Sequence, residues 1–145
     1  MPHRTLATFD AAFQDDAEWD KHGKSLVPGG RGVTEALRDA LERLGPRCTP
    51  VVQHSFYGWR FEFERDDRRF TCIVQSFEDE QWLLICEPRR SVLRKLVARR
   101  DKDNVAGGLT TIHEALTSDA RISKVQWHQR QEFEKGRSLG APTPT

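Results

Sequence analysis

Histidine and cysteine are the side chains most able to bind a transition metal or to serve as nucleophile and base, and this sequence spaces them far apart. They stand at His3, His22, Cys48, His54, Cys72, Cys86, His113 and His128. A zinc site needs such ligands close together, as in HExxH or CxxC, and no pair here has that spacing. We therefore expect no metal and no cofactor.

The three cysteines bear instead on the cell compartment. Their number is odd, they form no CxxC pair, and Cys72 and Cys86 lie within apolar runs. Cysteines of this kind are typically buried free thiols that pack as small hydrophobic side chains. The alternatives are a disulfide or metal role for the cysteines, and a thiol of lowered pKa at Cys86, close to Arg89 and Arg90. Buried free thiols, and an amino-terminal stretch without the apolar core of a secretion signal, predict a cytoplasmic protein.

Motifs for nucleophilic or phosphate chemistry are incomplete. There is no GxSxG, and Ser91 is followed by Arg94 where an SxxK motif needs lysine. The glycine-rich stretch 29–32 precedes an expected helix, where a phosphate could bind, but the lysine and Ser/Thr of a P-loop are missing. We interpret this stretch as a flexible loop. The paired carboxylates lie in expected turns or at solvated ends, so they predict no acid–base pair.

A run of cations between residues 87 and 102 departs most from an average sequence. Its basic residues are Arg89, Arg90, Arg94, Lys95, Arg99, Arg100 and Lys102. On a helix, four of these cations would lie opposite an apolar stripe at positions 92–97. These four are Arg90, Arg94, Lys95 and Arg99. Arginine donates paired hydrogen bonds to carboxylate or phosphate, so this face predicts a docking site for an acidic partner surface. A solvated face that pairs with local acids is the alternative.

The chain has 145 residues and a mass of 16.7 kDa, the size of one ordinary domain. Its net charge of +1 argues against a polybasic nucleic-acid binder. The aromatic residues between 56 and 63 lack the fixed glycine and basic positions of an RNA-stacking sheet, so nucleic-acid binding is not expected. Trp59, Phe61 and Phe63 alternate with charged residues and are therefore expected in the core. No apolar run is long enough to span a membrane, so no membrane contact is expected.

Apolar spacing indicates two helices in the first third of the chain. Apolar residues three or four apart favour a helix over 5–19, and a glycine-rich loop follows over 22–32. Positions 33–44 then carry one continuous apolar stripe, which predicts a second helix with Leu37 and Leu41 buried. Gly45 and Pro46 supply the expected stop.

From residue 51 onward the apolar period changes to two, which is typical of strands with one buried face. Strands are predicted over 51–56, 59–63, 70–77 and 81–86, with turns between them. Trp59, Phe61 and Leu84 are expected in the core. The short connections favour an antiparallel meander.

The last third of the chain alternates between helix and strand signals. Pro88 ends the sheet and begins a helix that carries the cations and buries Leu96, and Gly107 and Gly108 then break the chain. A short helix is expected around 112–116, and a last strand over 123–127. The polar residues from 129 onward form a tail expected to be disordered at its end.

These elements predict the α+β class. We expect a single antiparallel sheet of about four to five strands, a meander plus a C-terminal strand, with helices packed mainly on one face. The expected organisation is an N-terminal helical segment and loop over residues 1–28, the α+β domain over 29–128 and the polar tail over 129–145.

Part of the chain resembles small bacterial α+β domains of the immunity-protein type. The resemblance rests on residues 32–44, the sequence Tyr57-Gly58-Trp59-Arg60-Phe61 and the sequence Gln81-Trp82-Leu83-Leu84. It covers about residues 30–90 and consists of a helix, a strand that starts with Gly-Trp, and a meander. It implies a protein that neutralises a cognate toxin by binding it and that is not an enzyme.

Two functions are compatible with these observations. The first is a non-enzymatic, cytoplasmic protein-binding module, immunity-like or antitoxin-like, that docks an acidic partner surface through the basic helix; a homodimer is compatible with it. The alternative is a small enzyme or ligand-binding domain that binds an anionic small molecule in a cleft between sheet and helices, using arginines and His54 or His128. A closed core favours the first, and a deep pocket with converging histidine, arginine and acids favours the second.

Overall fold

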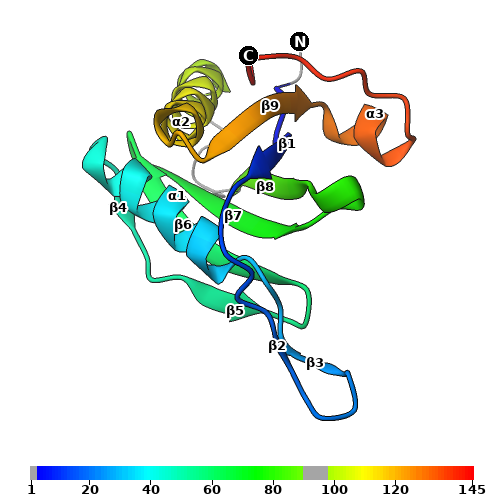
Figure 1. The fold of residues 1–145 in the computed structure, drawn as a ribbon. Coiled ribbons are helices and arrows are strands. Elements are labelled where there is room, and N and C mark those ends of the chain that lie inside the picture. Colours follow the sequence, from blue (N-terminus) through cyan, green and yellow to red (C-terminus); the bar gives the residue numbers. More distant parts are fainter. Residues whose placement is uncertain (1–2, 90–97) are drawn as a thin grey trace.

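The computed structural model of the protein describes residues 3–89 and 98–145. Its main element is a seven-stranded sheet in the order β4-β6-β7-β8-β1-β9, with β5 paired to β6. A separate two-stranded hairpin, β2-β3, projects away from this sheet (Figure 1). The strands are β1 (Leu6–Ala11), β2 (Glu18–Trp19), β3 (Ser25–Val27), β4 (Arg47–Cys48), β5 (Val52–His54), β6 (Gly58–Arg65), β7 (Arg68–Ser76), β8 (Trp82–Pro88) and β9 (Ile122–His128). The helices are α1 (Arg31–Arg43), α2 (Ala98–Ser118) and α3 (Arg130–Glu134), with a 3-10 turn, η1, at Glu78–Glu80.

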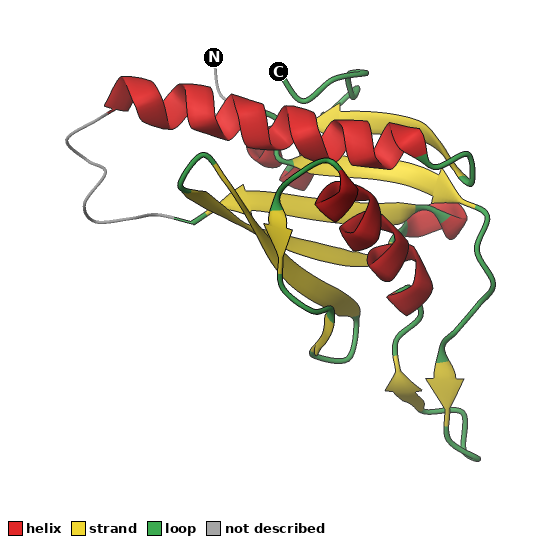
Figure 2. Cartoon of the chain, turned by 90° about the vertical axis from the view of Figure 1, so that its left-hand side faces the viewer, coloured by secondary structure: helices red, strands yellow, loops and turns green. Residues whose placement is uncertain are grey.

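The predicted α+β class with an antiparallel sheet is confirmed, and the sheet is larger than the predicted four to five strands. The additional strands are β1 and β4, which the sequence pattern does not identify. α1 and α2 cover one face of the sheet together (Figure 2). α3 lies on the other face, where the ring of Phe133 contacts the rings of Phe77 and His128. Helix packing on one face therefore describes α1 and α2 but not α3.

The alternation of apolar and charged residues builds the centre of the sheet as predicted. In the register of β6 and β7, Phe63 lies opposite Phe70, and their rings stack with centroids 4.8 Å apart. The turn between these strands is made by Asp66 and Asp67, whose φ values are 52° and 60°. Two left-handed residues in succession suit the right-handed twist of a tight hairpin, and aspartate tolerates this conformation well.

The predicted helix over 5–19 is wrong, because the first part of this segment is the strand β1. β1 lies between β8 and β9, and all four residues from Leu6 to Phe9 are buried. A central strand that is covered on both faces loses the alternation by which a strand is identified. The spacing of Leu6, Phe9 and Phe13 matches a helical face only because the run is short. Residues 12–17 are irregular and lead into the β2-β3 hairpin.

The predicted helix over 33–44 is confirmed as α1. Its buried stripe consists of Val33, Thr34, Leu37, Ala40 and Leu41. Gly30, the residue directly before α1, has no side chain that could cap the helix. The carboxylate of Asp16 serves as the cap instead. Asp16 Oδ1 accepts a hydrogen bond from the Gly30 backbone N–H at 2.8 Å, and Oδ2 accepts one from Gly32 at 2.7 Å. A carboxylate at this end also interacts favourably with the helix dipole.

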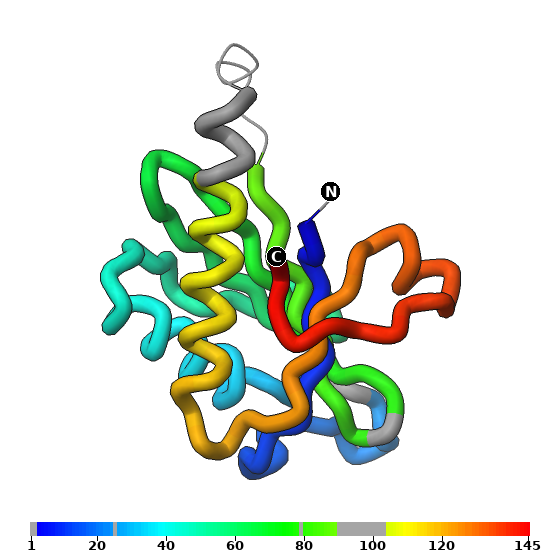
Figure 3. The backbone as a smooth tube through the Cα atoms, turned by 90° about the horizontal axis from the view of Figure 1, so that it is seen from above, coloured from blue at the N-terminus to red at the C-terminus, as the bar shows by residue number. Residues whose placement is uncertain are grey.

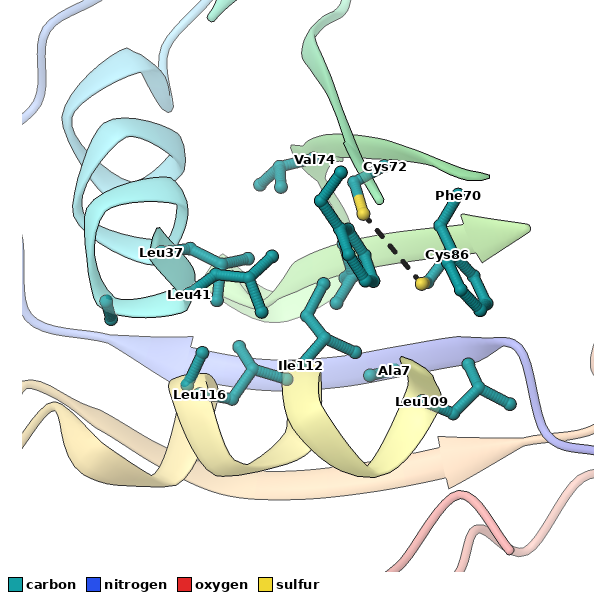
Figure 4. Packing of buried hydrophobic residues seen from close by; sticks show 14 of the residues in the cluster. Ala7, Leu37, Leu41, Phe70, Cys72, Val74, Cys86, Leu109, Ile112 and Leu116 are labelled. Atoms are coloured by element: carbon teal, nitrogen blue, oxygen red, sulfur yellow. Dashed lines mark hydrogen bonds between the residues drawn. The ribbon is translucent and has the colours of Figure 1, made fainter. Parts of the chain in front are cut away.

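Gly107 and Gly108 lie inside α2, so the predicted break is wrong. α2 is one continuous helix that includes the short helix predicted around 112–116. A β-carbon built at Gly108 would overlap the ring of Phe70, so glycine here permits the close approach of α2 to the sheet. Figure 4 shows the resulting contact between α1, α2 and the strands. The core residues that α2 contributes are Val105, Leu109, Ile112, Ala115 and Leu116.

The predicted core is confirmed wherever the structure describes it. The buried residues are Leu37, Leu41, Trp59, Phe61 and Leu84, each at most 5% exposed. The sixth predicted core residue, Leu96, lies outside the described residues.

The three cysteines are free thiols, as predicted. Cys72 and Cys86 face each other across β7 and β8, fully buried, with their sulfur atoms 3.8 Å apart (Figure 4). Burial raises the pKa of the Cys72 thiol well above its usual value, and the neighbouring Cys86 raises it further. Burial also raises the pKa of Cys48, which is half-buried, to about 11. Cys48 and Cys72 therefore remain protonated and unreactive at neutral pH.

The chain after β9 folds back onto the sheet, although a tail with a disordered end is predicted there. Backbone hydrogen bonds join Trp127 and Ala141 in both directions, at 2.7 and 2.8 Å. The His128 ring lies between two hydroxyls, with Nε2 3.0 Å from Thr8 Oγ1 and Nδ1 2.6 Å from Ser138 Oγ. Both ends of the chain consequently lie near the same edge of the molecule (Figure 3). The chain after β9 therefore packs against β1 and β9.

A second histidine makes the stability of the protein depend on pH. The indole N–H of the buried Trp127 donates a hydrogen bond to Nδ1 of His113 at 3.0 Å, which requires a neutral imidazole. Burial lowers the pKa of His113 below its usual 6.5, and Glu114 opposes this shift in part. The unfolded chain thus binds a proton more readily than the folded chain, so stability is full above about pH 6.5 and is lost as the pH falls.

We expect His113→Gln to reduce this pH dependence, because the glutamine amide does not titrate, while His128, whose pKa burial also lowers, keeps its own contribution. The measurement is the free energy of unfolding from urea denaturation between pH 7.5 and 5. His22→Gln is the control, since His22 lies in the exposed turn of the β2-β3 hairpin. An unchanged slope in the His113→Gln variant would contradict the role given to the Trp127–His113 hydrogen bond.

Candidate functional site

The cationic site predicted from the sequence lies almost entirely outside the described residues. Arg90, Arg94 and Lys95 belong to the segment 90–97, and Arg99 falls in the first turn of α2. Arg89, at the start of the basic run, is described, and its guanidinium lies 3.5 Å from Glu62 Oε2 on β6. Docking through the basic helix therefore stays a prediction.

The residues expected to serve a catalytic or anion-binding cleft do not come together. His54 lies on β5, where its ring contacts Tyr57 edge to face, and His128 lies on β9 at the opposite end of the sheet. His128 is buried between Thr8 and Ser138, and burial lowers its pKa. Within residues 3–89 and 98–145, no group of three or more histidine, cysteine or acidic side chains could hold a metal ion.

A cleft of about 710 Å³ lies where four separate segments meet, and we call it the aromatic cleft. The segments are the chain from β1 to β2, the start of α1, the turn between β5 and β6, and the connection between β7 and β8. Its aromatic lining consists of Phe13, Trp19, Phe56, Tyr57, Phe77 and Trp82. Its acidic lining consists of Asp15, Asp16 and Glu80. Figure 1 shows β2 and β5 near each other in the lower part of the view.

Three aromatic side chains of this cleft are unusually open to solvent. Trp19 is 61% exposed, Phe56 75% and Tyr57 52%. Single exposed apolar residues are common on protein surfaces, but several large ones that line one cleft typically mark a contact site. Tyr57 is supported from the side by the ring of His54, with ring centroids 5.5 Å apart. The cleft thus presents large apolar surfaces that the fold itself does not bury.

The inner wall of the aromatic cleft is fixed by close packing and by hydrogen bonds within the fold. Gly30 has a φ of 104°, and the ring of Trp82 lies so close that a β-carbon at this position would collide with it. The indole N–H of Trp59 donates to the carbonyl of Pro28 at 3.0 Å, and Asp16 binds the start of α1. These contacts join β6, β8 and α1. They fix the inner wall of the cleft, and the exposed aromatic residues lie beside this ordered wall.

The electrostatic character of the aromatic cleft is acidic. The Asp16 carboxylate accepts hydrogen bonds from two backbone N–H groups, whereas Asp15, within the described part of the chain, accepts only from the Ala17 N–H at 3.0 Å. Glu80 is exposed and stands on a left-handed backbone with a φ of 65°. Among the described residues, neither Asp15 nor Glu80 has an ion-pair partner, and the cleft lining contains no lysine, arginine or histidine. The cleft therefore disfavours an anion and favours a cation.

The sequence interpretation missed this site, although two signals were present. It assigned Trp59, Phe61 and Phe63 to the core, which is confirmed, and it gave no separate role to Phe56 and Tyr57, which are exposed. The adjacent pair Phe56-Tyr57 precedes the strand and breaks its alternation, which indicates a turn with exposed rings. The acids at 15 and 16 were treated as solvated charges, and nothing local shows that they face these aromatic residues.

Comparison with models of protein families, with curated proteins and with solved structures finds no match for this chain. The resemblance to immunity-protein-type domains gains no support from them. Nor does any helix in the described ranges combine the length and the apolar character needed to cross a membrane.

Proposed function

We propose that this chain is a non-enzymatic protein-binding module and that the aromatic cleft is its contact surface. The observation that carries the proposal is the exposure of Trp19, Phe56 and Tyr57 in one cleft with an ordered base. Aromatic residues are enriched at protein interfaces, where a few of them supply most of the binding energy. The free thiols favour a reducing compartment such as the cytoplasm as its place of action.

The aromatic cleft changes the chemistry expected of the partner. The sequence predicts an acidic partner surface for the basic helix, whereas the cleft is acidic and favours a basic partner segment. The immunity-like or antitoxin-like role is compatible with either surface. The alternative, binding of an anionic small molecule by arginine and histidine, finds no counterpart in this cleft, because its described lining holds neither residue.

The proposal is tested by capture followed by reconstitution. The bait is the full chain in three forms: wild type, Trp19→Ser with Phe56→Ser, and Leu139→Ser. Leu139 is 99% exposed in the C-terminal segment, so its replacement controls for the loss of exposed apolar surface elsewhere. We expect a protein from the source cell to bind wild type and Leu139→Ser and to be lost with the cleft variant.

The captured protein is then purified and its Kd for each form is measured by calorimetry. We expect the cleft variant to bind at least about tenfold more weakly, as removal of two central aromatic residues usually does. Circular dichroism and thermal unfolding verify that the cleft variant keeps its fold. Equal Kd values for all three forms would overturn the proposal.

A further inference from the structure

This inference rests on the proposed function and adds the chemistry of the occupant. We infer that the aromatic cleft receives a cationic side chain, a guanidinium or ammonium group, from the partner segment. The group would lie against the exposed aromatic faces and within reach of the carboxylates of Asp15 and Glu80.

The first support is the charge of the cleft. Both carboxylate oxygens of Asp16 accept hydrogen bonds from backbone N–H groups at the start of α1, where the helix dipole offsets much of the negative charge. Among the described residues, no lysine, arginine or histidine lines the cleft with Asp15 and Glu80, and the neighbouring Arg121, which lines an adjacent pocket with Glu80, is paired with Asp119. The carboxylates of Asp15 and Glu80 are both exposed to solvent, so they attract a cation at moderate strength and the attraction weakens as salt rises.

The second support is the chemistry of the walls. The face of an aromatic ring carries partial negative charge and attracts a cation placed over it, most strongly for tryptophan. Trp19, Phe56 and Tyr57 offer such rings, and each of these side chains is more than half exposed. A purely apolar occupant would use the rings but would leave the two carboxylates without a partner.

The third support is that the chain already places its own arginines on rings at the edge of this cleft. Arg121 lies over the ring of Phe13, which lines the cleft, with 4.0 Å from Cζ to the centroid. Arg31 lies over Trp59, beside the start of α1, at 5.5 Å. The surroundings of the cleft therefore accommodate guanidinium groups stacked on aromatic faces, which is the geometry inferred for the occupant.

The test uses a defined pair of small probes in place of the unidentified partner. N-acetylarginine methylamide carries the guanidinium, and N-acetylcitrulline methylamide has nearly the same shape without the charge. Each is titrated into the ¹⁵N-labelled full chain, and the indole N–H signals of Trp19 and Trp82 report on the cleft. We expect saturable shifts with the arginine probe and an affinity at least about fivefold weaker with the citrulline probe.

Removal of the acids separates the charge from the shape of the cleft. Asp15→Asn with Glu80→Gln keeps the side-chain shapes and an oxygen that can accept from Ala17. We expect this variant to bind the arginine probe about as weakly as wild type binds the citrulline probe. Glu114→Gln, an exposed acid on α2, is the control and should bind as wild type does.

Two results would overturn the inference. One is equal binding of the two probes in the cleft, and the other is the absence of any cleft shift with the arginine probe. Neither result decides the proposed function, because capture by wild type and its loss in the aromatic variant are measured without these probes. Conversely, arginine binding without any captured partner would support the preference of the cleft for a cation and would remove the protein-binding role.

Discussion

Replacement of Leu41 by alanine is expected to lower the free energy of unfolding by about 2–5 kcal/mol. Leu41 lies on the buried stripe of α1, with no exposed surface, and packs into the cluster shared with α2 and the sheet (Figure 4). Its removal would leave a cavity that neighbouring strands cannot fill without moving. The change is measured by urea denaturation followed by circular dichroism.

The same helix provides the control. Leu44 was part of the predicted apolar stripe, but it follows the last turn of α1 and is 45% exposed. Leu44→Ala should therefore change stability by less than about 0.5 kcal/mol. A loss below about 0.5 kcal/mol for Leu41→Ala as well would show that α1 is not packed as described.

The second large effect is expected at a position where alanine normally helps a helix. Gly108→Ala should destabilise the protein by about 1–3 kcal/mol, because its methyl group would overlap the Phe70 ring. That ring is stacked on Phe63 and has no exposed surface, so it has little room to move. Urea denaturation of the variant gives the size of the effect.

Gly107 is the matched position one residue earlier in α2. A methyl group there would meet only the end of the Arg65 side chain, which is 38% exposed and can turn away. Since alanine favours a helix over glycine by about 1 kcal/mol, Gly107→Ala should be neutral or stabilising. If both variants behaved alike, the close contact between α2 and Phe70 would be wrong.

The elements predicted correctly are those whose pattern is written in a short stretch of sequence. α1 and the strands β6 and β7 each bury mainly one face, so the period of their apolar residues reveals both type and orientation. β8 is found instead as a short apolar run between turns, and its consecutive residues Leu83 and Leu84 are both buried. β1 could not be found from its apolar period, because its pairing partners β8 and β9 are distant in sequence and its residues from Leu6 to Phe9 are buried on both faces of the sheet. The two glycines of α2 were misleading for a similar reason, since their partner Phe70 lies on β7.

The aromatic cleft depends on long-range contacts to a still greater extent. Trp19, Phe56 and Glu80 come from three connections that no local pattern relates, and they meet only because β1 enters the sheet beside β8. The cationic run, by contrast, is conspicuous in the sequence, yet its central residues 90–97 lie outside the described structure. The charge pattern of the sequence therefore predicts the basic helix as the contact surface, whereas the fold points to the aromatic cleft.

The central claim is that a partner protein covers the aromatic cleft, and hydroxyl-radical footprinting of the reconstituted complex tests it most directly. The rates of oxidation of Trp19, Phe56, Tyr57 and Leu139 are measured by mass spectrometry with and without partner. We predict that the first three, which are exposed in the free chain, become several-fold slower to oxidise, while Leu139 is unchanged. Unchanged rates at all three aromatic residues in a chain saturated with partner would contradict the account.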